Sequence, residues 1–198
     1  ELSGMPGSES VVAEGPWAGS TLSELIGRFG AELLGKANYA RFGQEFPLLV
    51  KFIDAREDLS IQVHPDDELA RKRHGKSGKC EMWYVLEAEP GASLLTGFSR
   101  PIAPAEYERR VADNTLTDVL NRQAIASGDV FYLPAGRVHS IGKGSFIVEI
   151  QQSSDITYRI YDFDRRDAAG NSRELHTELA REAIDFESSE NSRITYAP

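Results

Sequence analysis

Three short segments of this sequence carry polar side chains whose types and spacing suit metal chemistry. In the first, 58–64, strand alternation places Ser60, Gln62 and His64 on one face and apolar residues on the other. Residues two apart on a strand face lie side by side, so Gln62 and His64 could bind one ion. A half-exposed strand with a polar outer face would show the same pattern, and this segment alone leaves both interpretations open.

The second segment, 78–89, places Lys79, Glu81 and Trp83 on one face of a predicted strand. Large apolar residues flank Glu81, and a carboxylate drawn into such surroundings needs a partner, because an unpaired buried charge is strongly destabilising. Lys79 could be that partner. A metal ion would be a better partner for this carboxylate.

The third segment joins an apolar strand to a tight turn and a histidine. Gly128 and Pro134 bracket the strand, Gly136 completes the turn, and His139 follows three residues later. Chance agreement with this spacing is rare, so it is the strongest of the three signals.

Together these segments resemble the type I mannose-6-phosphate isomerases, also called phosphomannose isomerases, in particular their short bacterial form within the cupin superfamily. The stretch 128–139 is similar to the second cupin motif, and the runs LSIQVHPDD, GKCEMWYVL, LPAGRVHSIG and EIQQSSDITYRIYDF narrow the resemblance. Gln62 replaces the first histidine of the usual cupin H-x-H pair, and Glu81 follows a helical insertion. Both departures are shared with this family.

The resemblance implies one Zn²⁺ per chain, held by Gln62, His64, Glu81 and His139. Two imidazoles, a carboxylate and an amide oxygen also form a chemically suitable set for zinc. The implied reaction is the interconversion of mannose 6-phosphate and fructose 6-phosphate through an enediol, so the expected partner is a small phosphorylated sugar.

The last of these runs, 149–163, holds the residues to which the resemblance assigns the chemistry. It implies a catalytic role for Arg159 and a role as base for Glu149, while an ordinary hairpin with a surface glutamate and arginine remains open from the residues alone. The resemblance also implies that Lys51, Ser60 and Lys79 hold the substrate phosphate.

Two other functions stay open. Two histidines and a carboxylate also form the facial triad of non-haem iron enzymes, so a cupin dioxygenase is one alternative. Gln62 and the predicted phosphate-binding lysines argue against it. The other alternative is a metal-bearing sugar-phosphate binding domain without turnover.

The amino-acid composition argues against several other classes of function. The 198 residues are 40% hydrophobic and 27% charged, with a formal net charge of −9, which argues against nucleic acid and anionic membranes as partners. No apolar run approaches the ~20 residues needed to cross a bilayer. The single cysteine, Cys80, excludes an internal disulfide and favours a reducing, cytoplasmic location. The sequence does not indicate an oligomeric state.

The elements that must position these residues are mostly strands. We expect a mainly β fold, a cupin-type jelly-roll barrel with helical insertions, in a single domain 1–198 that looks truncated at both ends, with its core at about 46–165. The polar tail from 187 is expected to be loosely held. The predicted strands are 48–54, 58–64, 80–88, 92–97, 129–133, 145–152 and 156–163. The predicted helices are 20–30, 66–75, 103–113, 115–123 and 176–186.

Overall fold

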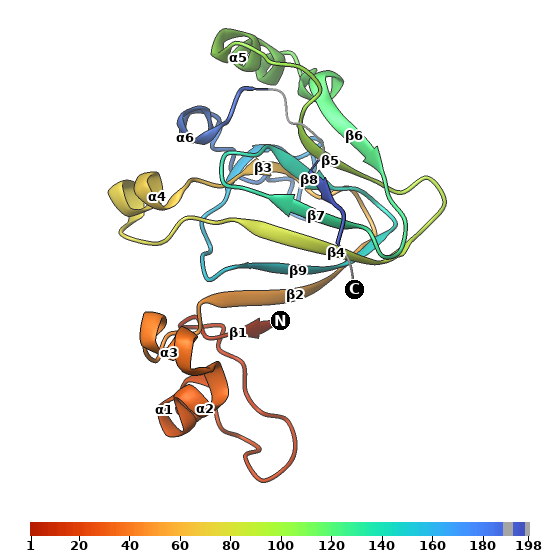
Figure 1. Cartoon of the computed structure of the whole chain (residues 1–198). Helices are drawn as coiled ribbons and strands as arrows, with labels where there is room; N and C mark the ends of the chain where they lie inside the picture. The colour runs from red at the N-terminus through yellow and green to blue at the C-terminus, as the bar shows by residue number, and fades with distance from the viewer. Residues whose placement is uncertain (188–191, 197–198) are drawn as a thin grey trace.

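The computed structural model of the chain describes residues 1–187 and 192–196, and within them the strands form two facing antiparallel sheets (Figure 1). The six-stranded sheet contains, in spatial order, β1 (Leu2–Ser3), β2 (Leu48–Ala55), β9 (Ser145–Gln152), β4 (Glu81–Ala88), β7 (Val130–Leu133) and β11 (Arg193–Ile194). The five-stranded sheet contains β10 (Tyr158–Tyr161), β3 (Ile61–Val63), β8 (His139–Ile141), β5 (Ser93–Phe98) and β6 (Leu120–Ala124).

The helices lie at the edges and on the outer side of this pair of sheets (Figure 1). They are α1 (Leu22–Phe29), α2 (Ala31–Leu34), α3 (Lys36–Phe42), α4 (Asp67–His74), α5 (Pro104–Ala112), a 3₁₀ turn η1 (Leu116–Val119) and α6 (Thr177–Ala183). Local chemistry sets the starts of two of them. Thr21 and Glu24 form a reciprocal capping box for α1, and the Asp66 side chain accepts a hydrogen bond from the Leu69 amide to begin α4.

Strand alternation decides what enters the space between the sheets. Along β9, Ser145, Ile147, Glu149 and Gln151 are buried, and the residues between them are half-buried on the outer face. The apolar part of this interior consists of Ala55, Trp83, Val85, Leu94, Phe131, Leu133, Ile141 and Ile147. Because Glu149 and Gln151 lie further along the same inner face, the interior has an apolar part and a polar part.

A second core lies on the outer face of the five-stranded sheet. There Ile61 and Val63 of β3 pack in one cluster with Ala70 of α4, Tyr107 of α5 and Ala180 of α6. This cluster stabilises β3 from behind, since the residues alternating with Ile61 and Val63 must then face the other way, into the space between the sheets. The polar face of this strand is therefore the inner one.

Most predicted strands are confirmed, and one predicted helix is wrong. The segment 115–123 forms only the short η1 turn before β6, which pairs with β5 through Leu94–Gln123 and Leu95–Arg122. Pairing with an available strand edge has overridden the local helical pattern. Sequence reasoning also missed α2, α3 and β8. It assigned the polar tail to loose structure, but part of that tail, β11, pairs with β7; residues 188–191 and 197–198 lie outside the described part of the chain.

The mainly β class with helical insertions is confirmed, whereas the single-domain assignment stays a prediction. In residues 1–187 and 192–196, no helix is long and apolar enough to cross a membrane.

Candidate active site

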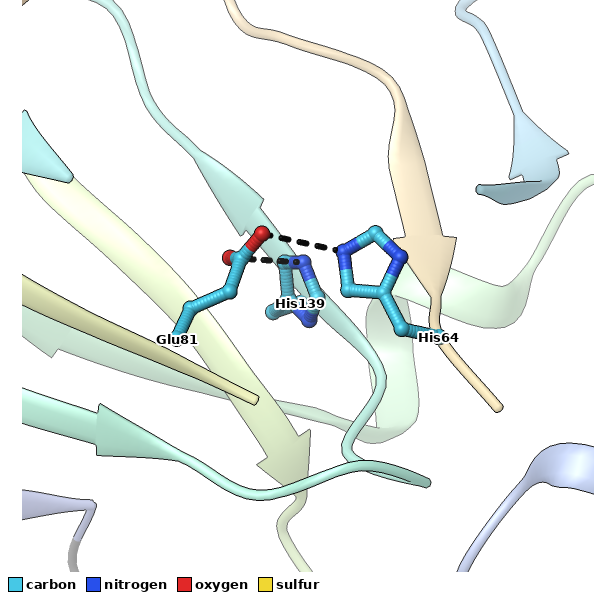
Figure 2. Close-up of side chains that lie close together, drawn as sticks. All are labelled: His64, Glu81 and His139. Carbon is cyan, nitrogen blue, oxygen red and sulfur yellow. Dashed lines mark ion pairs between the residues drawn. The ribbon is translucent and has the colours of Figure 1, made fainter. Parts of the chain in front are cut away.

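His64, Glu81 and His139 come together in the polar part of the interior (Figure 2). His64 directly follows β3, Glu81 is the first residue of β4 and His139 is the first residue of β8. Each offers a ligand atom, and these atoms all lie within 4.8 Å of one another. The three residues are almost fully buried, with exposed fractions of 2%, 1% and 1%.

The two imidazoles are held in one orientation by backbone carbonyls. His64 Nδ1 lies 2.9 Å from the Ile156 carbonyl oxygen, and His139 Nδ1 lies 2.7 Å from that of Arg137. A carbonyl only accepts, so each Nδ1 carries the proton and each Nε2 presents a lone pair. These Nε2 atoms face Glu81, at 3.2 Å from Oε1 for His64 and 3.5 Å from Oε2 for His139.

This arrangement leaves polar atoms unsatisfied. His64 Nε2 and both carboxylate oxygens of Glu81 are buried without a hydrogen bond of acceptable geometry. Buried polar groups are nearly always hydrogen-bonded, and a buried polar group without a hydrogen bond destabilises the fold by about 1–3 kcal/mol. Two lone pairs and a carboxylate that converge without protons between them would all be satisfied by one cation.

The protonation states agree with this interpretation. Burial lowers the pKa of His64 to about 4 and also lowers that of His139, so both rings are neutral at neutral pH. Burial by itself raises the pKa of Glu81, but the surrounding histidines and Lys79 outweigh it and leave that pKa well below its ordinary value. Neutral imidazole and ionised carboxylate are the forms that bind metals.

Gln62 and Lys79 border the cluster. The Gln62 carboxamide nitrogen lies 3.4 Å from His139 Nε2, and a half-turn of the amide brings its oxygen to the same place. Lys79 Nζ lies 2.8 Å from Glu81 Oε1, so the lysine expected as a simple ion-pair partner is present. It neutralises the carboxylate but leaves the lone pair of His64 Nε2 without a partner. The donor set therefore fits a divalent cation with nitrogen and oxygen ligands, of which zinc is typical.

Glu149 lies on the inner face of β9 between two cross-strand neighbours. Trp83 Nε1 donates to Glu149 Oε2 at 3.0 Å, and Lys51 Nζ donates to Oε1 at 3.1 Å and to Gln151 Oε1 at 2.9 Å. Burial and the neighbouring charge of Glu81 raise the pKa of Glu149 above its ordinary value. Glu149 is thus a clamped, buried carboxylate and not the surface residue of an ordinary hairpin.

Arg159 lies on the sheet opposite Glu149, and its Nη1 donates to the Glu174 carbonyl at 3.0 Å. β9 belongs to the six-stranded sheet and β10 to the five-stranded sheet, so the segment between them crosses from one sheet to the other and forms no hairpin. Arg159 pairs with Gln62 in register, which places both side chains on the inner face of their strands. Ser60 precedes β3 on the same face by alternation and is buried, with an exposed fraction of 5%.

Sequence reasoning missed two members of this polar set, Trp83 and Gln151. It placed Trp83 on the face of Glu81 but gave it no role, because its partner Glu149 is adjacent only through strand pairing. Gln151 follows Glu149 at the two-residue spacing of one strand face, a signal that was available in the sequence. A cavity of about 780 Å³ lies elsewhere and is lined in part by Phe46, Arg71 and Ser154. We place the site at the buried cluster because the unsatisfied ligand atoms are there.

Comparison with known proteins agrees with this geometry. Residues 3–98 match the family model "Phosphomannose isomerase type I, catalytic domain". The mannose-6-phosphate isomerase of Streptococcus mutans is 40% identical over 183 residues, covering 92% of this chain and 56% of that protein. The chain belongs to the type I phosphomannose isomerase family. It spans about half the length of the curated relatives it matches.

Solved structures of phosphomannose isomerases share the fold. The crystal structure of mannose 6-phosphate isomerase from Bacillus subtilis matches with a TM-score of 0.85 and 37% identity, over 96% of this chain and 59% of that one. A mannose 6-phosphate isomerase described as bound with zinc and yttrium matches with a TM-score of 0.62 and 16% identity, over 86% of this chain and 62% of that one. The predicted cupin-type fold is confirmed by the first match.

Proposed function

We propose that this chain carries the zinc centre and the catalytic residues of a mannose-6-phosphate isomerase, which interconverts mannose 6-phosphate and fructose 6-phosphate. The observation that carries the proposal is the buried cluster of His64, Glu81 and His139, whose ligand atoms converge without protons between them in a chain of this family. Gln62 beside His139 supplies the fourth ligand of the proposed set. The names of the relatives and the zinc-bound neighbour support the same assignment.

Aldose–ketose isomerisation moves a proton between C2 and C1 through an enediol, so the site needs a base and a group that stabilises a developing oxyanion. Bound zinc supplies Lewis acidity toward the oxygens of the sugar. Arg159, always cationic and facing the same interior, adds planar donors to the substrate oxygens. Glu149 is the proposed base, since burial favours its protonated form and brings its pKa closer to the operating pH.

The roles predicted for Lys51, Ser60 and Lys79 as phosphate ligands stay predictions. Lys51 pairs with Glu149 and Lys79 pairs with Glu81, so each ammonium already faces a buried carboxylate. Either lysine would have to share its charge in order to bind phosphate.

The direct test is a coupled isomerase assay on this chain, with and without a chelator, together with elemental analysis. His139→Ala removes one ligand and should leave a folded protein with little zinc and turnover near background. His74→Ala is the matched control, because His74 is exposed on α4 and its Nε2 contacts the Tyr158 hydroxyl at 2.8 Å instead of a member of the cluster. Stoichiometric zinc retained in His139→Ala would contradict the ligand assignment, and oxygen uptake by the iron-loaded protein would favour the dioxygenase.

A further inference from the structure

The crossing segment, residues 153–157, carries the chain from β9 in one sheet to β10 in the other and contacts the buried cluster on its way. Its Ile156 carbonyl oxygen lies 2.9 Å from His64 Nδ1. That contact fixes the tautomer of His64 and directs its Nε2 toward Glu81. The geometry of the cluster therefore depends on how the crossing segment is held.

Ser154 uses all of its polar groups to hold the crossing segment. Its hydroxyl donates to the Ser77 carbonyl at 2.9 Å and accepts from the Ile156 amide at 3.5 Å. Its own amide donates to the Gln152 carbonyl at 2.8 Å, and its carbonyl accepts from Gln151 Nε2 at 2.9 Å. Ser154 is only 2% exposed, so protein groups and not solvent satisfy it.

The Ser77 carbonyl belongs to the insertion 65–80, which contains α4 and separates two of the candidate ligands along the chain. The two ends of this insertion are tied together, because Lys79 N donates to the Pro65 carbonyl at 3.1 Å. Its final part packs closely on its beginning, since a Cβ at Gly78 would lie 2.4 Å from the backbone at the start of α4. The insertion is therefore a closed loop, and the Ser154 hydroxyl fastens the crossing segment to it.

Few other contacts join the insertion to the crossing segment. The cavity of about 780 Å³ borders both, with Ser77 and Ser154 among its lining residues, so open space adjoins them on that side. The ion pair between Lys76 and Asp155 also links them, but its side chains are 53% and 55% exposed and solvent screens it. Apart from that pair, the Ser154 hydroxyl makes the only hydrogen bond between the two segments in residues 1–187 and 192–196.

We propose that Ser154 is a positioning residue of the metal centre, which keeps the Ile156 carbonyl on His64 by fastening the crossing segment to the insertion. This inference rests on the proposed function, because it takes the buried cluster as a metal site. The outer partners of metal-binding imidazoles set ring orientation and basicity, and their loss weakens metal binding about 10–100-fold. Ser154 acts one contact further out, so its loss belongs at the lower end of that range.

The test measures metal binding without turnover. Competition with a chromogenic chelator gives the dissociation constant for Zn²⁺, and the visible absorption of bound Co²⁺ reports the geometry around the metal. Ser154→Ala should raise the dissociation constant for Zn²⁺ about tenfold and change the Co²⁺ spectrum. Ser154→Thr keeps the hydroxyl, and the adjoining cavity has room for the added methyl group, so this variant should recover most of the affinity.

Ser153→Ala is the matched control. Ser153 precedes Ser154 and borders the same cavity, but among the described residues its hydroxyl makes no hydrogen bond, so both metal readouts should stay unchanged.

Urea unfolding of the metal-free variants separates positioning from stability. The proposal is overturned if Ser154→Ala lowers the free energy of unfolding but binds Zn²⁺ and Co²⁺ as the unaltered chain does. It is also overturned if Ser154→Thr loses as much affinity as Ser154→Ala. Failure of the unaltered chain to bind zinc would refute the proposed function and this inference together, whereas the other two outcomes leave the proposed function intact.

Discussion

The hydrogen bond from Trp83 to Glu149 is the contact through which the fold orients the proposed base. Trp83 is fully buried, and its ring also lies edge-on to His139, with centroids 5.4 Å apart and planes at 80°. Trp83→Phe keeps an aromatic edge toward His139 but removes the indole N–H. The substitution therefore tests the hydrogen bond separately from the packing.

The expected cost follows from the burial of both partners. A hydrogen bond to a charged group contributes about 1.5–3 kcal/mol, and Glu149 is only 4% exposed, so water cannot replace the lost donor. Loss of the atoms that distinguish indole from phenyl adds a cavity worth about 1–2 kcal/mol. Trp83→Phe should thus lower the free energy of unfolding by about 2.5–5 kcal/mol.

A double-mutant cycle isolates the hydrogen bond from the cavity. Urea unfolding is measured for the unaltered chain, Trp83→Phe, Glu149→Met and the double variant, and the cavity contribution cancels in the coupling energy. We expect a coupling of about 1.5–3 kcal/mol between the two sites. Zinc content should stay unchanged in Trp83→Phe, since no ligand is removed.

A coupling below about 0.5 kcal/mol would refute this reasoning, because the contact would then contribute no more than an exposed pair. Zinc loss in Trp83→Phe with normal coupling would show that the indole acts mainly through His139. Cys80→Ser is a useful control on the same strand segment, since its side chain faces away from Glu81.

Two further predictions concern stability. Gly142→Ala should destabilise the chain by about 3 kcal/mol, because a Cβ there would lie 2.1 Å from the Ser93 carbonyl oxygen. Gly27 faces open space within α1, so Gly27→Ala should stabilise the chain by about 1 kcal/mol. Chemical denaturation of both variants tests these values. The hydrogen bond from Lys76 lowers the pKa of Asp155 in the folded chain. The ion pair therefore stabilises the fold fully at pH values above the unfolded-state pKa of ~3.9, and this stabilisation is lost as the pH falls through the folded-state pKa. Lys76→Met should therefore lower the free energy of unfolding by a few tenths of a kcal/mol at pH 7 and by progressively less as acid protonates Asp155. A cost that does not fall with pH would contradict the assignment.

Several features of the fold follow from local patterns in the sequence. The capping box of Thr21 and Glu24 predicted α1, and alternation predicted β9 and β4 almost to the residue. Prediction was poorest where pairing decides the structure. The segment 120–124 became β6 because β5 offered it an edge, and a helical pattern with few buried residues could not compete with that pairing.

The candidate ligands were determined by residue type and spacing. Gln62 and His64 share a strand face at a separation of two, and His139 follows a turn defined by Pro134 and Gly136, so those side chains could be selected without coordinates. What they do was decided by the tertiary structure. Only the facing of two sheets brings Glu81 to the imidazoles. Backbone carbonyls direct both Nε2 atoms at it, that of Ile156, far from His64 in sequence, and that of Arg137, two residues before His139.

For the charged residues around the cluster, too, sequence indicated the residues and tertiary structure determined their contacts. The family resemblance implied roles for Glu149 and Arg159 and assigned Lys51 and Lys79 to the substrate phosphate, whereas the residues alone left a surface hairpin open. Strand pairing then clamped Glu149 between Trp83 and Lys51, and the crossing from β9 to β10 placed Arg159 on the opposite sheet. Cross-strand neighbours have no fixed separation along the chain, and the free energy of a buried charge depends on all of its neighbours. Those contacts therefore became visible only when the two sheets closed on each other.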